Sequence, residues 1–257
     1  VGVKNNKKTF GELTLTYGLG YLFVRGISFL LLPLYTNLLS PSETGFIFLF
    51  LTLLAFLNTF YNHGMDSSLL KFYTKKDSKE IITTSICYSV LFGLLLSVII
   101  IILKNQILLL FIQPTLPNNL IYYLVLILFF DMLISRTKNI IRLLEKPYYY
   151  LIISLLNVLA SLMFNIYFIN TLQMGVEGAL ISLVIVSFIQ FLLITPIIIK
   201  FFNLSYFHKD LLYKMLSFSL PFLPAAMFFI IIEMSDRWMI EWLGNIHEVG
   251  LYGSGYK

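Results

Sequence analysis

Charged residues are scarce in this chain of 257 residues, since only 12% are Asp, Glu, Lys or Arg while 58% are hydrophobic. A soluble domain carries about 25% charged residues, so this chain has too few to cover a water-facing surface. Cysteine is also scarce, because Cys87 stands alone in an apolar stretch. A disulfide framework and a cysteine-based metal site are therefore excluded within these residues. The composition indicates a membrane protein.

Motifs of metal or hydrolytic chemistry are missing as well. His63, His208 and His247 are far apart and form no HExxH pair, which leaves a catalytic metal without support. The sequence has no GxxxxGK[ST] loop for ATP hydrolysis and no GxSxG nucleophile motif. We therefore expect no cofactor and no enzymatic activity. Any transport would be coupled to an ion gradient of H⁺ or Na⁺, or to consumption of the product.

Long apolar runs fill most of the chain. A helix needs about 20 residues to cross the hydrocarbon core, and lipid leaves no other way to satisfy the backbone of such segments. The sequence thus predicts an all-α polytopic membrane helix bundle, with an eighth span starting at Val249. The seven complete spans are expected at residues 13–38, 44–63, 81–103, 119–142, 148–170, 176–199 and 214–243.

Basic residues gather on one side of these spans. With a cytoplasmic N-terminus, the inner connections hold 14 of the 18 lysines and arginines, and the outer connections hold only Lys104. The positive-inside rule therefore predicts a cytoplasmic N-terminus. Clusters between apolar runs also argue against nucleic acid as a partner, despite the net charge of +5. We expect the segment 66–80 to form a short helix on the inner leaflet, against anionic membrane lipids.

Two stretches of the chain repeat each other: LLLPLYTNLLSPSETGFIFLF at 30–50 and IEWLGNIHEVGLYGSGY at 240–256. A shift of 205 positions places Leu38 on Leu243, Glu43 on Glu248 and Gly45 on Gly250. Six spans separate the copies, so both have the same orientation in the membrane. This is the parallel repeat found in some transporters. Prolines 221 and 224 predict a bend in the seventh span.

Three stretches together resemble the polysaccharide-biosynthesis flippases of the multidrug/oligosaccharidyl-lipid/polysaccharide exporter superfamily: YGLGYLFVRGISFLLLPLYTNLLSPSETGFIFLF, NHGMDSSLLKFY and DRWMIEWLGNIHEVGLYGSGYK. The resemblance implies two lobes of six helices around a cavity that opens alternately to either side. It implies translocation of polyprenyl-diphosphate-linked oligosaccharide across a bacterial plasma membrane, for surface polysaccharide such as O-antigen. Polysaccharide polymerase or glycosyltransferases are the implied protein partners.

The same resemblance divides the chain into two parts. Residues 1–200 are expected to form the N-terminal lobe of six helices, and residues 201–257 a cytoplasmic connection followed by the start of a second lobe. Because the family has a complete second lobe, we expect this chain to be a fragment or a truncated product.

Arg25 is the first candidate for substrate binding, because a charge inside a span usually faces a cavity or a partner. It shares a helical stripe with Tyr21 and Ser28. Two roles are open for it: contact with the diphosphate of a lipid-linked sugar, which a planar guanidinium matches, or a structural ion pair with Asp131. Asp131 in turn either binds the coupling H⁺ or Na⁺ or neutralises Arg25.

Further candidates stand in the second and seventh spans. Asn58 and Asn62 either line the cavity toward sugar hydroxyls or join helices to each other. Asp236 and Arg237 point about 100° apart, so we expect one to face the cavity and the other a neighbouring helix or the membrane interface. The substrate-binding candidates are Tyr21, Arg25, Ser28, Asn58, Asn62, Asp131, Asp236 and Arg237.

Three other functions remain open from the sequence. A drug or cation antiporter of the same superfamily has the same expected fold, but it needs acidic cavity residues, and Arg25 favours an anionic substrate. A membrane enzyme acting on polyprenyl lipids needs a sizeable polar loop with catalytic residues, whereas the connection 64–80 is short and basic. The third alternative is a remnant of a flippase that does not transport.

Overall fold

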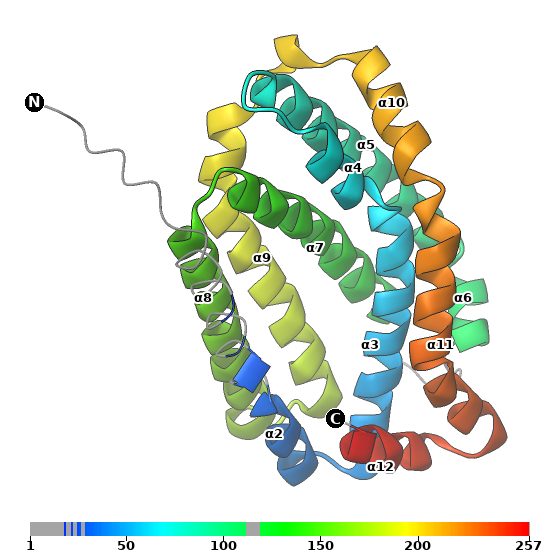
Figure 1. Cartoon of the computed structure of the whole chain (residues 1–257). Coiled ribbons are helices and arrows are strands. Elements are labelled where there is room, and N and C mark those ends of the chain that lie inside the picture. The colour runs from blue at the N-terminus through cyan, green and yellow to red at the C-terminus, as the bar shows by residue number, and fades with distance from the viewer. Residues whose placement is uncertain (1–17, 19–21, 23–24, 27–28, 112–118, 257) are drawn as a thin grey trace, which may run out of the picture.

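The computed structural model describes residues 18, 22, 25–26, 29–111 and 119–256, and within this part it is a bundle of helices without strands (Figure 1). The expected all-α class is confirmed. The short helices are α2 Leu31–Leu38, α4 Met65–Phe72, α6 Lys104–Phe111, η2 Leu204–Tyr206, α10 Lys209–Ser219 and α12 Ile246–Tyr256. The long ones are α3 Pro41–Asn62, α5 Ser78–Ile102, α7 Leu120–Leu143, α8 Pro147–Asn165 with its π-helical extension η1 Ile166–Thr171, α9 Gly175–Phe201 and α11 Phe222–Leu243.

Five helices of the described part are long and apolar enough to cross a membrane: α3, α5, α7, α8 with η1, and α9. A sixth span is formed if α10 and α11 are counted as one, with a bend of 41° between them. Pro221 stands at this bend, as its sequence position predicted. The six agree with the expected second to seventh spans, while nearly half of the expected first span lies outside the described residues.

The connections divide between two ends of the bundle. The turns around residues 73–77, 144–146 and 202–208 lie together at one end, which holds Lys75, Lys146 and Lys209, and we call it the basic end (Figure 1). The turns after α2, η1 and α11 lie at the opposite end. This is the segregation that the distribution of lysine and arginine predicted.

Helix α7 lies in the middle of the bundle and contacts α3, α5, α8 and α9. Its side chains Leu124, Leu128 and Met132 are fully buried in the largest hydrophobic cluster. By contrast, Leu91, Leu94 and other leucines of α5 remain exposed. An exposed apolar face of this kind suits contact with lipid tails, where apolar side chains cost nothing.

Helix α4 corrects one expectation. A short helix does form within 66–80, but it is tucked into the bundle, with Met65 and Leu69 fully buried. It packs against α5, α7 and α10, and Ser68 Oγ donates a hydrogen bond of 2.9 Å to the carbonyl oxygen of Met215. The basic residues that suggested a surface position begin only at Lys71, in the last turn of the helix.

Candidate functional site

The repeat is visible in the helix boundaries. Helix α2 ends at Leu38 and α3 begins at Pro41, while α11 ends at Leu243 and α12 begins at Ile246, each 205 positions later. The helix caps repeat as well. In the first copy Glu43 N donates to Ser40 Oγ at 3.3 Å, and in the second Glu248 N donates to Asn245 Oδ1 at 3.0 Å. Ser and Asn are preferred at this position because their side chains satisfy an otherwise unpaired helix N–H.

The two copies meet through their glycines. A Cβ atom placed on Gly45 would collide with the carbonyl oxygen of Ile246, and one placed on Gly250 would collide with that of Pro41. Pro41 and Ile246 are themselves equivalent in the repeat, so the contact is reciprocal, like an interface between identical subunits. Helix α12 therefore crosses the first turns of α3 with backbone against backbone, at the end opposite to the basic end (Figure 1).

A pocket of about 390 Å³ lies between α3 and α11, further toward the basic end. Asn58 and Asn62 are among its lining residues, and Asn62 Nδ2 donates to Asn58 Oδ1 at 2.9 Å. The Oδ1 atom of Asn62 is buried and accepts no hydrogen bond from a described residue. Both amides thus belong to the wall of a pocket, and their mutual bond stays within α3.

A second pocket, of about 460 Å³, lies between α7, α8 and α9, and we call it the α7–α9 pocket. Hydrogen bonds join the three helices around it: Ser187 Oγ to Asp131 Oδ1 at 2.8 Å, Asn157 Nδ2 to Gln190 Oε1 at 2.9 Å, and Arg142 Nη2 to Tyr150 Oη at 2.6 Å. Its other polar lining residues are Ser135, Lys138, Asn139 and Ser161. Polar groups inside a membrane are costly, so a pocket lined by this many of them is a candidate functional site.

Two substrate-binding candidates, Tyr21 and Ser28, lie outside the described residues. Arg25 is described, and its residue is exposed. The hydrogen bond that Asp131 accepts comes from Ser187, and Lys138 of its own helix interacts with it electrostatically. The expected pairing of Arg25 with Asp131 stays a prediction.

Asp236 and Arg237 are closer to each other than their helical directions suggested. Arg237 Nη1 lies 3.5 Å from Asp236 Oδ1, and Arg237 is buried. The other carboxylate oxygen, Asp236 Oδ2, accepts a hydrogen bond of 2.5 Å from Tyr252 Oη of α12. Two neighbours in sequence form an ion pair here because long side chains can bend back along the helix. The pair stands near the crossing of the two repeat copies, and neither residue lines the pocket between α3 and α11.

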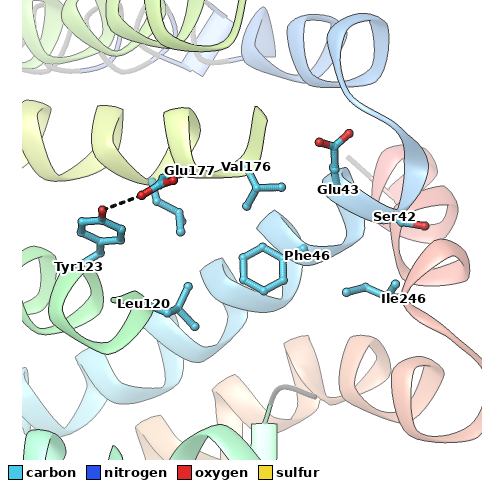
Figure 2. Close-up of a pocket in the computed structure, with 9 residues that line it drawn as sticks. Ser42, Glu43, Phe46, Leu120, Tyr123, Val176, Glu177 and Ile246 are labelled. Carbon is cyan, nitrogen blue, oxygen red and sulfur yellow. Dashed lines mark hydrogen bonds between the residues drawn. The ribbon is translucent and has the colours of Figure 1, made fainter. Parts of the chain in front are cut away.

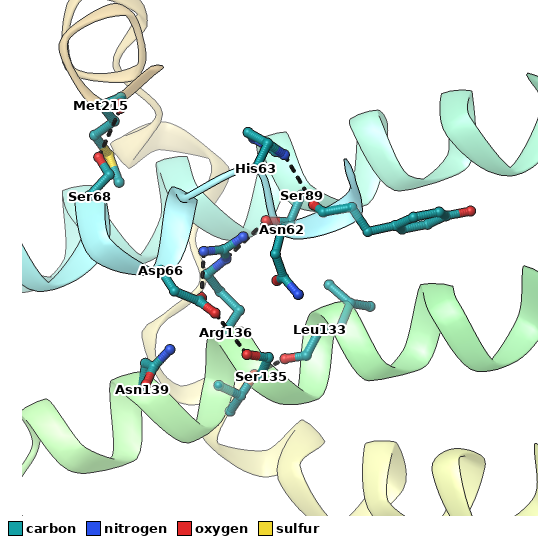
Figure 3. Close-up of polar contacts among 12 residues, drawn as sticks. Asn62, His63, Asp66, Ser68, Ser89, Leu133, Ser135, Arg136, Asn139 and Met215 are labelled. Atoms are coloured by element: carbon teal, nitrogen blue, oxygen red, sulfur yellow. Dashed lines mark hydrogen bonds and ion pairs between the residues drawn. The ribbon is translucent and has the colours of Figure 1, made fainter. Parts of the chain in front are cut away.

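A buried ion pair that sequence reasoning missed lies at the basic end (Figure 3). Arg136 is 0% exposed, and its Nη1 atom lies 2.6 Å from Asp66 Oδ1. Ser135 Oγ donates to Asp66 Oδ2 at 2.8 Å, and Arg136 Nε donates to Ser89 Oγ at 3.3 Å. The network fastens α4 to α5 and α7, and its members are too far apart in sequence for a local pattern to reveal them.

A third pocket, of about 270 Å³, lies beside the glycine crossing (Figure 2). Phe46, Leu120, Val176 and Ile246 give it an apolar wall, and Tyr123 Oη donates to Glu177 Oε1 at 3.2 Å. No lysine or arginine lines this pocket among the described residues. Its walls are therefore unsuited to an anionic ligand.

Residues 11–257 match the family model described as polysaccharide biosynthesis protein. The chain belongs to the polysaccharide biosynthesis protein family. A search of curated proteins found no match. Among solved structures, the chain is similar to an outward-facing multidrug resistance MATE family transporter of the MOP superfamily, with a TM-score of 0.62 and 15% identity.

That similarity covers 94% of this chain and 61% of the transporter's chain. At this identity it shows the fold alone. The chain thus spans about three fifths of the transporter that it matches. The family, together with several helices long enough to cross a membrane, makes this a multi-pass membrane protein.

Several residues of the α7–α9 pocket were not among the candidates from the sequence. Lys138, Asn157 and Gln190 line the α7–α9 pocket although none was a candidate. A signal did exist, because Asn157 and Ser161 are four residues apart on α8, and Ser187 and Gln190 are three apart on α9. Polar residues at helical spacing inside an apolar span mark one face of a helix, and such faces point away from lipid.

Proposed function

We propose that the chain is part of a flippase that moves polyprenyl-diphosphate-linked oligosaccharide across the plasma membrane by alternating access, with the basic end in the cytoplasm. The observation that carries the proposal is the neutral amide wall of the pocket between α3 and α11. Asn58 and Asn62 line this pocket at the junction of the two repeat copies, where transporters built from repeats hold their substrates. Amide groups donate and accept hydrogen bonds, as sugar hydroxyls do.

The repeat supports a place for Arg25 in the same cavity. The offset of 205 positions equates Tyr21 with Ala226 and Arg25 with Ile230, and both equivalents line the pocket between α3 and α11. By this symmetry Arg25 would face the corresponding wall on the other side of the junction. A guanidinium there would bind the diphosphate of the substrate, with Ser28 one helical turn away.

Alternating access needs a closure that can open. Gly45 and Gly250 bring α3 and α12 into close backbone contact at the end opposite to the basic end, and we propose this contact as the closure. Asp236 joins the closure through Tyr252, beside Arg237. Opening would separate α12 from α3, and Asp131 would bind the coupling H⁺ or Na⁺.

A drug or cation antiporter is the second candidate, favoured by the fold likeness to a MATE family transporter. The pocket between α3 and α11 contains no acidic residue among its described lining residues, which makes a cationic substrate the weaker choice. We propose a transporter rather than an enzyme, in line with the family and with the fold likeness to a MATE family transporter.

Replacement of both amides, Asn58→Leu with Asn62→Leu, tests the proposal in cells that carry the whole gene as their only copy. Each lost hydrogen bond costs about 1 kcal/mol, so export of surface polysaccharide should fall at least about tenfold while lipid-linked oligosaccharide accumulates. Arg25→Ala should abolish export, and Arg25→Lys should restore part of it.

The matched control is Asn119→Leu, since Asn119 is an exposed amide just before α7. Equal amounts of each variant in the membrane must be shown by immunoblot. Normal surface polysaccharide with new sensitivity to cationic drugs would favour the antiporter. A gene deletion without either phenotype would favour the remnant.

A further inference from the structure

The charged residues that line the α7–α9 pocket from α7 are arranged in order, with the carboxylate first and the two cations closer to the basic end. Asp131, Lys138 and Arg142 follow one another toward the basic end and all line the pocket. At 1.5 Å per residue, Asp131 and Arg142 are about 16 Å apart along the helix axis, and Asp131 and Lys138 about 10 Å. The carboxylate therefore lies deep in the bundle, whereas both cations stand near the basic end.

Lys138 is the unusual member of this row. It is partly buried, and within the described part of the chain it forms neither a hydrogen bond nor an ion pair closer than 4.0 Å. By contrast, Arg136, two residues earlier on α7, forms an ion pair with Asp66 of α4, as a cation with a structural role does. The electrostatic interaction of Lys138 with Asp131 is not an ion pair within 4.0 Å, so the N–H donors of the ammonium group are available to a ligand.

Arg142 is held in place by Tyr150 and Asn139. Its Nη2 atom donates to Tyr150 Oη at 2.6 Å, its Nη1 atom lies 3.5 Å from Asn139 Oδ1, and the guanidinium lies 4.7 Å from the Tyr150 ring centre. Two of five N–H donors are used in these contacts, because the guanidinium carries five. A positioned planar fork of this kind recognises phosphate oxygens.

Gln190 gives an independent indication of a ligand. The residue is only 5% exposed, and its Oε1 atom accepts from Asn157. Its Nε2 atom is buried and has no partner among the described residues. A buried amide donor without an acceptor is costly, so a ligand that brings an oxygen atom to this position would satisfy it.

Asp131 does not oppose an anion at the basic end. Ser187 Oγ donates to it, and it lies about two helical turns from Lys138. With Lys138 and Arg142 charged, cations outnumber carboxylates in the pocket lining. The volume of about 460 Å³ lies within the range of small-molecule sites.

We infer that the α7–α9 pocket is a binding site for a phosphate-class anion, held by Lys138 and Arg142 with the Gln190 amide as a further donor. It is separate from the pocket between α3 and α11, where the proposed function places the sugar and, through Arg25, the diphosphate of the transported substrate. Three ligands offer such phosphate oxygens: a polyprenyl diphosphate, an anionic phospholipid headgroup and free phosphate. The inference rests on the proposed function only if the natural ligand is the first of these.

Binding is tested with the protein from its whole gene, purified into nanodiscs of phosphatidylcholine, and with inorganic diphosphate as the probe in titration calorimetry. Hydrogen bonds to charged groups contribute about 1.5–3 kcal/mol, so Lys138→Gln and Arg142→Gln should each weaken diphosphate binding by about 10-fold to 100-fold. Gln190→Leu should weaken it less, and Lys138→Arg should retain it.

Lys76→Gln is the matched control, because it removes an exposed lysine between α4 and α5 that lies outside the pocket. Unfolding temperatures of all variants identify any that fail to fold, and Lys138→Arg keeps the test decisive if Lys138→Gln is one of them. Wild-type protein that binds no diphosphate, or folded pocket variants that bind it as tightly as Lys76→Gln does, would overturn the inference.

Two further nanodisc preparations distinguish the sources, one with polyprenyl diphosphate and one with phosphatidylglycerol. The lipid that displaces inorganic diphosphate is the ligand, and displacement by neither assigns the site to free phosphate. The experiments distinguish a failure of the flippase proposal from a failure of the anion-site inference. Diphosphate binding without an export phenotype in the Asn58/Asn62 variant leaves the site and removes the flippase, and the reverse result leaves the flippase and removes the site.

Discussion

The two copies of the repeat agree in their backbone and differ in their charges. Both have a turn of two residues between helices, an N-cap that pairs with a glutamate three residues later, and a glycine at the crossing. Helix α11 then carries Glu233, Asp236, Arg237 and Glu241, where the offset in the first copy gives Ser28, Leu31, Leu32 and Thr36. The shared features are those that the crossing needs, and the charges are free to specialise each copy.

The largest loss of stability is expected at the basic end, just after the first copy of the repeat, where α3 is followed by α4. Asp66→Asn leaves the fully buried Arg136 without its carboxylate, and unpaired buried charges cost about 3–5 kcal/mol. Denaturant unfolding of the purified protein should show this loss. The double variant Asp66→Leu with Arg136→Met should recover most of the stability, because it removes both charges. A single variant as stable as wild type would mean that the pair does not anchor α4.

The crossing itself is the next target. Gly45→Ala and Gly250→Ala each force a methyl group into a backbone carbonyl of the other copy, and overpacking costs about 1–3 kcal/mol. The two effects should not add, since both relieve the same contact by moving the helices apart. Thermal unfolding measures the change.

Gly255→Ala is the control for helix propensity, because nothing lies within 4 Å of the added Cβ atom. It should stabilise α12 by at most about 0.5–1 kcal/mol, the usual gain from Gly to Ala inside a helix, because Gly255 lies in the last turn. The opposite signs at Gly250 and Gly255 are the expected result. Equal signs would contradict a tight crossing.

The smallest losses of stability are expected at the helix N-caps. They test whether the two copies depend equally on their caps. Ser40→Ala and Asn245→Ala should each cost about 1 kcal/mol in unfolding measurements. Glu43→Ala should cost more than Glu248→Ala, because Glu43 Oε2 also accepts from Ser40 N at 2.9 Å and from Ser40 Oγ at 2.8 Å. A larger loss at Glu248 would show that the second turn depends on contacts other than its cap.

The spans and the repeat could be predicted because they rest on local patterns: apolar length, helix caps and the spacing of glycine and glutamate. The buried position of α4 could not, since it depends on Asp66 meeting Arg136, 70 residues further along the chain. The same holds for the site. Asp131 was found because a carboxylate in an apolar span is conspicuous, whereas Lys138 resembles any other lysine of its basic cluster until the helices around it are placed.

The reciprocal glycine contact has a genetic consequence. In a dimer of identical chains, each substitution at such a contact is made twice, and both halves must tolerate it together. Here Gly45 and Gly250 belong to one chain, so each can mutate while the other is kept. A joint that began as symmetric can therefore drift into an asymmetric one by single steps, and α11 can gain charges that α2 never carried.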